Sequence, residues 1–157
     1  MLVIKNLKDV PEYLPQLAQW HHQEWLHLNP GLSLEQRIEK MQAYLNENAI
    51  PQTFVALDEA VDQSALLGSA AVIDSDMDTK PELTPWLASV YVDKKQRRQG
   101  IGTTLVKAIM QYVQGLDFSE MYLFTPDQAS FYNGLGWQLL EQTEYRDENV
   151  TVMKFSW

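Results

Sequence analysis

The sequence contains no cysteine, and this absence excludes several kinds of chemistry. A chain without cysteine has no disulfide framework, no thiolate nucleophile and no cysteine-based metal site, and the absence suits a reducing compartment. Long apolar runs are also missing, because no stretch approaches the roughly 20 residues of a membrane-spanning helix. The first residues, MLVIKNLKDVPEY, lack the apolar core and cleavage motif of a signal peptide. We therefore expect a soluble cytoplasmic protein with no membrane partner.

Positive charge is scarce, since 12 Lys and Arg face 21 Asp and Glu and give a formal net charge of -9. This balance argues against a nucleic-acid partner, which requires a cationic surface. The acidity is compatible with a cationic substrate such as an amine, although it could serve solubility alone. With 157 residues, 45% of them hydrophobic, we expect a single domain over 1–157 with a buried core. The sequence leaves monomer and homodimer open.

Metal ligands follow no binding pattern. The three histidines, His21, His22 and His27, are spaced so that no two share a helix face as His-x3-His would. The carboxylate-rich segment 74–78 lacks the rest of a calcium loop, including its closing Glu. We therefore expect no metal, and we interpret the histidines as structural or solvent-facing.

Patterns of period two and period 3.6 alternate along the chain and predict an α/β fold with a mixed sheet. Strands are expected around residues 2–7, 53–57, 65–73, 86–92, 121–124, 137–140 and 150–155, and helices around 14–28, 34–45, 101–112 and 129–133. N-terminal caps are expected at Asp9, at Ser33 with Gln36, and at Asp127. Pro15 belongs in a first helical turn, so the main first helix should begin near Leu14.

The chain is organised around residues 85–112, where a strand, a cationic turn and a helix follow one another. Lys94, Lys95, Arg97 and Arg98 place four of the twelve cations within five residues of an acidic chain. The helix opens at Gly100-Ile101-Gly102, where free N–H groups meet glycines that let an anion approach. This combination predicts a phosphate site. The alternative is a basic turn between strand and helix that binds no ligand and whose glycines only allow tight packing.

The pattern Arg97-x-x-Gly100-x-Gly102 matches neither common nucleotide motif. A Walker A loop needs Gly-x4-Gly-Lys-Ser/Thr, and the dinucleotide Gly-x-Gly-x-x-Gly fails because residue 105 is leucine. The pattern instead resembles the acyl-CoA pyrophosphate loop of the GNAT N-acetyltransferase superfamily. The segment ASFYNGLGW over 129–137 resembles the "A..FY...GF/W" segment of the same family. The expected order β-α-α-β-β-β-α-β-α-β-β is also that of the family, so the resemblance covers essentially the whole chain.

The resemblance implies an acyltransferase that moves an acetyl group from the co-substrate acetyl-CoA to a primary amine of a small molecule or peptide. It implies that backbone groups of Val90 and Val92 pair with the pantetheine arm, and that the N–H groups of 98–102 hold the pyrophosphate. The strand 121–124 would splay from the central one to admit the thioester. Contacts to the co-substrate are expected at Val90, Tyr91, Val92, Arg97, Arg98, Gln99, Gly100, Ile101, Gly102, Thr103 and Phe131.

Tyr132 matches the family tyrosine that often acts as general acid. A departing thiolate, whose free thiol has a pKa of about 8.5, benefits from such a proton donor. Its alternative role is an aromatic residue packed on the sheet, as expected of Phe131 beside it.

The general base is left unassigned. Several family members carry a glutamate in the central strand, but residues 86–92 contain no acid. An alkylammonium with a pKa near 10.4 benefits from a base, and the candidates are Glu24 (as base or amine-binding residue), Asp74, Asp76 and a water held by Ser89. The amine could also bind already neutral.

Four tryptophans are candidates for the acceptor pocket. Trp86 and Trp137 are expected to shape it, whereas Trp20 and Trp25 could line it or belong to the core. The missing strand acid also supports a different class of function, a non-catalytic acyl-CoA sensor or interaction module on the same fold. A further alternative is a related enzyme that transfers a longer acyl group.

Overall fold

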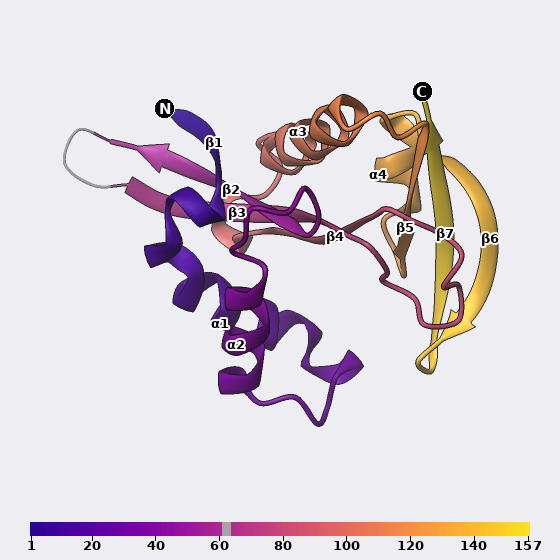
Figure 1. The fold of residues 1–157 in the computed structure, drawn as a ribbon, viewed down its shortest axis with the longest axis horizontal. Coiled ribbons are helices and arrows are strands. Elements are labelled where there is room, and N and C mark those ends of the chain that lie inside the picture. Colours follow the sequence, from indigo (N-terminus) through magenta and orange to yellow (C-terminus); the bar gives the residue numbers. More distant parts are fainter. Residues whose placement is uncertain (61–63) are drawn as a thin grey trace.

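The computed structural model describes residues 1–60 and 64–157, which form one mixed sheet covered by helices on both faces (Figure 1). The strands are β1 (Leu2–Asn6), β2 (Gln52–Glu59), β3 (Ser64–Ile73), β4 (Trp86–Val92), β5 (Glu120–Thr125), β6 (Gln138–Tyr145) and β7 (Glu148–Ser156). The helices are α1 (Leu14–Trp25), α2 (Leu34–Ala43), α3 (Ile101–Gly115) and α4 (Ala129–Gly134). Short 3-10 turns cover η1 (Leu7–Asp9), η2 (Pro11–Tyr13), η3 (Leu26–Leu28) and η4 (Lys94–Gln96). The predicted order of the main elements is confirmed.

The seven strands lie in the order β1-β2-β3-β4-β5-β7-β6. Neighbouring strands are antiparallel except β4 and β5, which run parallel. In the described part of the chain, β4 and β5 share a single register pair, Trp86 with Tyr122. Because this pair stands at the start of β4, the two strands part beyond it, as the sequence led us to expect. Among residues 1–60 and 64–157, the rest of this β4 edge has no strand partner.

Each face of the sheet has its own core, because successive side chains of a strand point to opposite faces. On one face, Val55 and Leu57 pack with Leu14 and Leu17 of α1. On the other, Ala56 belongs to the cluster that contains the buried stripe of α3. Figure 1 shows α1 and α2 on one side of the sheet and α3 on the other. None of the helices within residues 1–60 and 64–157 has the length and apolar character needed to cross a bilayer.

The helix starts confirm part of the predicted capping. Ser33 and Gln36 form a reciprocal capping box at α2, and α1 begins at Leu14 with Pro15 in its first turn. Asp9 is not a cap: Asn6 accepts from the Lys8 N–H at 3.0 Å and opens the 3-10 turn η1 instead.

The capping prediction at Asp127 was also wrong. Helix α4 begins at Ala129, so its N-cap position falls on Gln128 and Asp127 lies outside it. The Gln128 N–H is bound by Thr125 Oγ1 at 3.0 Å, which satisfies the turn from the strand side.

Candidate active site

The parted edges of β4 and β5 border a cleft of about 1130 Å³. One end is lined by the start of α3 and the turn before it, and the middle by β4, the end of β5 and α4. The other end is lined by α1, α2, the β3–β4 loop and the turn between β6 and β7. The cleft thus joins the predicted phosphate loop to residues that are distant in sequence.

The turn before α3 is shaped by left-handed backbone and by Arg97. Gly100 is the N-cap of α3 with φ of 81°, and Arg98 also has a positive φ of 66°. Arg97 Nε donates to the Val92 carbonyl at 2.9 Å, and its guanidinium lies 5.6 Å from the centre of the Tyr91 ring. Arg97 therefore ties the turn back to the end of β4 and helps to shape it.

The backbone amides of this turn can receive an anion. Within the described residues, no hydrogen bond engages the N–H groups of residues 98–103, which stand at the positive end of α3. A Cβ placed on Gly100 would meet nothing within 4 Å, so the surface above it is open. A Cβ on Gly102 would make ordinary contacts with Val92 and Phe131 at 3.6 and 3.7 Å. The residues present therefore fit a bound diphosphate.

The cleft brings together all but one of the predicted co-substrate residues. Those that line it are Val90, Tyr91, Val92, Arg97, Arg98, Gly100, Ile101, Gly102, Thr103 and Phe131. The Gln99 side chain does not line it, and its Nε2 lies 3.5 Å from Gln96 Oε1 instead.

Strand β4 is distorted where it borders the cleft. The register with β3 shifts between the pairs Ser69–Tyr91 and Ala71–Ala88, so β4 carries a bulge at Ser89 and the residue after it. Ser89 has φ of 54°, which is strained for a residue other than glycine. The Ser69 hydroxyl donates to the Ser89 carbonyl at 2.8 Å and helps to hold this conformation.

His21 of α1 completes this buried chain of hydrogen bonds. Its Nε2 lies 2.8 Å from Ser69 Oγ, and the side chain is buried but reaches the cleft wall. The single hydroxyl hydrogen of Ser69 is donated to Ser89, so His21 must donate from Nε2 and be unprotonated on Nδ1. Burial and the charge of Arg37 lower the His21 pKa to about 3 and keep the ring neutral. The interpretation of His21 as structural is consistent with these contacts.

Tyr132 lies on α4 at the wall of the cleft and is buried. Its ring packs against Phe131 and Trp137 with centroid distances of 5.0 and 6.1 Å. Burial, together with the charge of Asp127, raises the Tyr132 pKa well above its usual range. The hydroxyl therefore keeps its proton at every working pH, and the ring also has the packing role that was considered for it.

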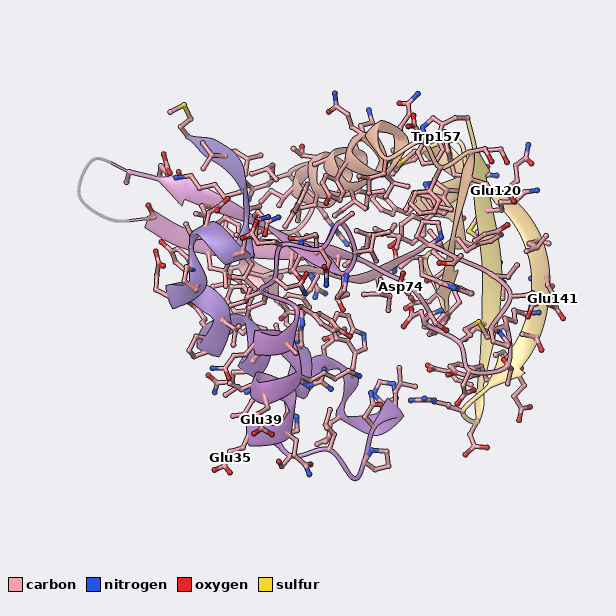
Figure 2. All side chains as sticks on the ribbon, in the orientation of Figure 1. Glu35, Glu39, Asp74, Glu120, Glu141 and Trp157 are labelled. Atoms are coloured by element: carbon pink, nitrogen blue, oxygen red, sulfur yellow. The ribbon has the colours of Figure 1, made fainter. Side chains whose placement is uncertain are left out.

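The candidates for the general base differ in whether they line the cleft. Glu24, Asp76 and Ser89 line the cleft, whereas Asp74 is exposed on the β3–β4 loop and does not (Figure 2). Burial raises the Asp76 pKa to about 6, against the opposing charges of Lys40 and Arg146. Among the carboxylates considered from the sequence, Asp76 thus combines a place in the cleft with a shifted pKa.

The tryptophan predictions were half wrong. Trp86 and Trp137 are core residues with exposures of 0% and 1%, and neither lines the cleft. Trp86 packs under the β3–β4 loop, where its Nε1 donates to the Leu83 carbonyl at 2.6 Å. Trp25 does line the cleft, and Trp20 lines a smaller hollow of about 270 Å³ that also includes Glu24.

Several residues at the far end of the cleft escaped the sequence analysis. Arg37, Lys40 and Tyr44 line it from one face of α2, at spacings of three and four residues. That spacing could have been recognised in the sequence as a second, polar face of the helix beside its apolar stripe. Arg146 had none, because its contact with the Leu28 carbonyl at 3.3 Å spans 118 residues and depends on the β6–β7 turn.

No cluster of three or more His, Asp or Glu side chains suited to a metal ion occurs among the residues that the structure describes.

Solved structures share this fold at low sequence identity. An aminoglycoside 6'-N-acetyltransferase complexed with coenzyme A matches with a TM-score of 0.74 at 17% identity, covering 98% of this chain and 96% of that one. The Salmonella typhimurium protein yncA with its cofactor acetyl-CoA matches with a TM-score of 0.71 at 14% identity, covering 99% and 93%. An acetyltransferase from Streptococcus agalactiae matches with a TM-score of 0.70 at 18% identity, covering 99% and 98%. Curated protein sequences contain no significant match to the chain.

The family assignment follows from a sequence model as well as from the fold. Residues 14–137 match the model of the acetyltransferase (GNAT) family, a range that extends from the start of α1 to the tryptophan before β6. It includes both segments on which the resemblance was based. The chain belongs to the acetyltransferase (GNAT) family.

Proposed function

We propose that the protein is an N-acetyltransferase that uses acetyl-CoA to acetylate a primary amine. The observation that carries the proposal is a single cleft with an anion-accepting turn at one end, Tyr132 in its middle and Asp76 at the other end. Bound acetyl-CoA supplies a thioester: the amine nitrogen bonds to its carbonyl carbon, the carbon–sulfur bond breaks, and the thiolate leaves. Solved relatives of the same fold contain coenzyme A or acetyl-CoA, which supports this choice of co-substrate.

The turn before α3 would hold the diphosphate of the co-substrate. The amides of 98–103 supply donors, and the αL conformation of Gly100 directs them to one side. The unpaired edge of β4, with Val90 and Val92 at the cleft, supplies backbone groups for the amides of the pantetheine arm. The open space over Gly100 admits the phosphates without steric conflict.

Asp76 is our choice for the group that accepts the proton of the amine. With a pKa of about 6 it is mostly ionised at neutral pH, yet it is more basic than an ordinary carboxylate. The nitrogen becomes far more acidic as it bonds to the carbonyl carbon, so its proton can pass to Asp76 as that bond forms. Glu24, which also lines the cleft, has the alternative role of attracting the ammonium group.

Tyr132 is proposed as the proton donor to the leaving sulfur. Its raised pKa ensures that a proton is present, although it also makes the hydroxyl a weaker acid than a free tyrosine. The charge that develops on sulfur would stand in the same buried surroundings, and burial raises the proton affinity of both groups. The tyrosine then recovers its proton from solvent, and one proton is released to solvent from Asp76 in each cycle.

Two measurements test the proposal. Isothermal calorimetry should detect acetyl-CoA binding well below hundreds of micromolar, and free thiol should appear when a panel of primary amines is added. Binding without amine-dependent thiol release would identify an acyl-CoA sensor on this fold. Absence of binding would reject the enzyme and the sensor alike, and a faster reaction with longer acyl-CoA would reject acetyl transfer.

A further inference from the structure

Helix α2 carries its charges on two separate sides. Arg37 and Lys40 line the cleft, whereas neither acid of the helix, Glu35 or Glu39, does so. Figure 2 shows Glu35 and Glu39 pointing away from the sheet at the outer side of α2. Like charges three or four residues apart on a helix are mildly unfavourable, so this arrangement does not serve helix stability. It places two cations on one wall of the cleft in a protein of net charge -9.

Arg37 has no counter-ion. Its Nε and Nη2 are shut off from solvent and have no hydrogen-bond partner, and it forms no ion pair among the residues that the structure describes. Burial lowers the pKa of its guanidinium, which reflects the cost of keeping this charge away from water. Arg37 is half-buried, so a partner for its two enclosed nitrogens would relieve part of the cost of taking them out of water.

Two other charged groups at this end of the cleft already have partners. Arg146 Nη1 donates to the side chain of Asn29 at 3.0 Å, and Nη2 lies 3.7 Å from a carboxylate oxygen of Asp78. Glu148 lies 3.8 Å from His27. Arg37 differs from the exposed Lys40 on the same wall, because two of its nitrogens are both enclosed and without a partner.

Arg37 and Asp76 are separate centres of opposite charge. Arg37 stands on α2 and Asp76 on the β3–β4 loop, and no ion pair joins them among the residues that the structure describes. A bound molecule that reaches both centres would have a cationic or basic nitrogen near Asp76 and an anionic group near Arg37. The planar guanidinium is well suited to a carboxylate, which it binds through two parallel hydrogen bonds.

We propose that the acceptor is a primary amine that also carries a carboxylate, and that Arg37 binds this carboxylate from the cleft face of α2. The inference deepens the proposed acetyl transfer and rests on it. Because the two unpaired nitrogens are enclosed, binding requires the long Arg37 side chain to turn them towards the ligand, and the carboxylate then supplies the counter-ion. Lys40, on the same helix face, strengthens the attraction.

Paired acceptors provide the test. Each amino acid in a panel, including β-alanine and 4-aminobutyrate, is compared with the alkylamine in which a methyl group replaces the carboxylate. We expect the carboxylated member of the preferred pair to have a kcat/KM at least tenfold higher. Arg37→Gln should lower that value roughly 10- to 100-fold, the range for hydrogen bonds to a charged group, and should lower the value for the plain amine by a clearly smaller factor. Arg37→Lys should retain part of the preference.

Controls separate the outcomes. Lys107→Gln, which removes an exposed cation from α3 outside the cleft, should leave both acceptors unaffected. If Arg37→Gln fails to fold, inhibition of wild-type amine acetylation by butyrate provides the same test, and no inhibition at high millimolar concentration would overturn the inference. Equal rates with both members of every pair would overturn it while leaving acetyl transfer intact, and so would a preference for phosphoethanolamine over every carboxylated amine. Absence of thiol release with every amine would remove the proposed function and this inference together.

Discussion

His21 Nε2 lies 2.8 Å from Ser69 Oγ, and through this contact helix α1 is joined to the bulge of β4. Ser69 stands on β3 with 0% exposure, and its hydroxyl hydrogen is used on the Ser89 carbonyl at 2.8 Å. The serine thus accepts from one element and donates to another. A single buried hydroxyl stabilises the strained residue that borders the candidate reaction centre.

Ser69→Ala should lower the free energy of unfolding by about 2–4 kcal/mol. The change removes two hydrogen bonds and leaves the His21 N–H and the Ser89 carbonyl without their partner, and each unsatisfied buried group costs about 1–3 kcal/mol. Urea unfolding measures the loss. Ser64→Ala, at the exposed start of the same strand, is the matched control and should change stability by less than about 0.5 kcal/mol. A loss below about 1 kcal/mol for Ser69→Ala would contradict the role given to this hydroxyl.

Acidification should weaken the protein through His21. The folded-state pKa of about 3 lies below the ordinary histidine pKa of about 6.5, so protons bind preferentially to the unfolded chain. The contribution of the neutral ring is complete above pH 6.5 and is lost as pH falls from there towards 3. Unfolding free energies between pH 4 and 8 should show up to about 1.4 kcal/mol per pH unit from this group.

His21→Gln isolates that contribution, because a glutamine amide can still donate to Ser69 but does not titrate. The difference between wild type and variant should therefore vary with pH only below about 6.5. Asp76 acts with the opposite sign: its pKa is raised, so it opposes folding as pH rises from about 4 to 6. The matched control is the same substitution at the exposed His27, His27→Gln. A pH-independent difference between wild type and His21→Gln would refute the assignment of a neutral buried ring.

Local patterns were sufficient to predict the order of the elements. The range 86–92 for the central strand, the start of α1 at Leu14 and the capping box at Ser33 all depend on neighbours in sequence. The predicted N-cap at Asp127 was wrong because composition does not place the start of a six-residue helix to within one residue. The prediction that Trp86 shapes the acceptor pocket was wrong because strand alternation defines two faces of the sheet but does not say which one is buried.

The site was predictable where one segment builds it and unpredictable where several meet. The turn before α3 is continuous in sequence, and its glycines and cations are visible in it. The acceptor end combines Asp76 from a loop, Arg37 from α2 and Arg146 from a hairpin turn. The raised pKa of Asp76 arises from burial in the folded chain, so no spacing rule distinguishes it from Asp74.

Asp76→Asn should remove one ionisation from the pH dependence of acetylation. In the wild type, kcat/KM should rise with pH through about 6, because the carboxyl must lose its proton before it can accept one from the amine. The variant should have kcat lowered roughly 100-fold, within the usual 10²–10⁴ range for a general base, and should lack this rise. Asp74→Asn is the matched control on the same loop, and a wild-type profile in Asp76→Asn would exclude Asp76 as the base.

Gly100→Ala should weaken acetyl-CoA binding about tenfold. A residue with a Cβ is disfavoured by about 1–2 kcal/mol at the φ of 81° found here, so the free turn would relax and binding would have to restore it. Gly115→Ala is the control, since its Cβ also meets nothing within 4 Å but its φ is not positive. Calorimetry should give an unchanged Kd for Gly115→Ala, and an unchanged Kd for Gly100→Ala would argue against diphosphate binding at this turn.

Tyr132→Phe should lower turnover while leaving the affinity for acetyl-CoA nearly intact. The ring packing against Phe131 and Trp137 is kept, so only the hydroxyl proton is lost from the cleft wall. Loss of a positioned proton donor lowers kcat by about 10²–10⁴-fold, and an acetyl thioester that releases a more acidic thiol should show a smaller loss.

Tyr112→Phe controls for the removal of a phenol hydroxyl. Its hydroxyl donates to the Ala49 carbonyl at 2.7 Å, away from the cleft, so that variant should lose stability but not turnover. Stopped-flow measurement of thiol release, with calorimetry of acetyl-CoA binding beside it, separates the two effects. Equal turnover in Tyr132→Phe and wild type would leave the tyrosine as a packing residue. The raised pKa of Tyr132 would then belong to a hydroxyl that takes no part in the reaction, and the leaving sulfur would have to take its proton from solvent.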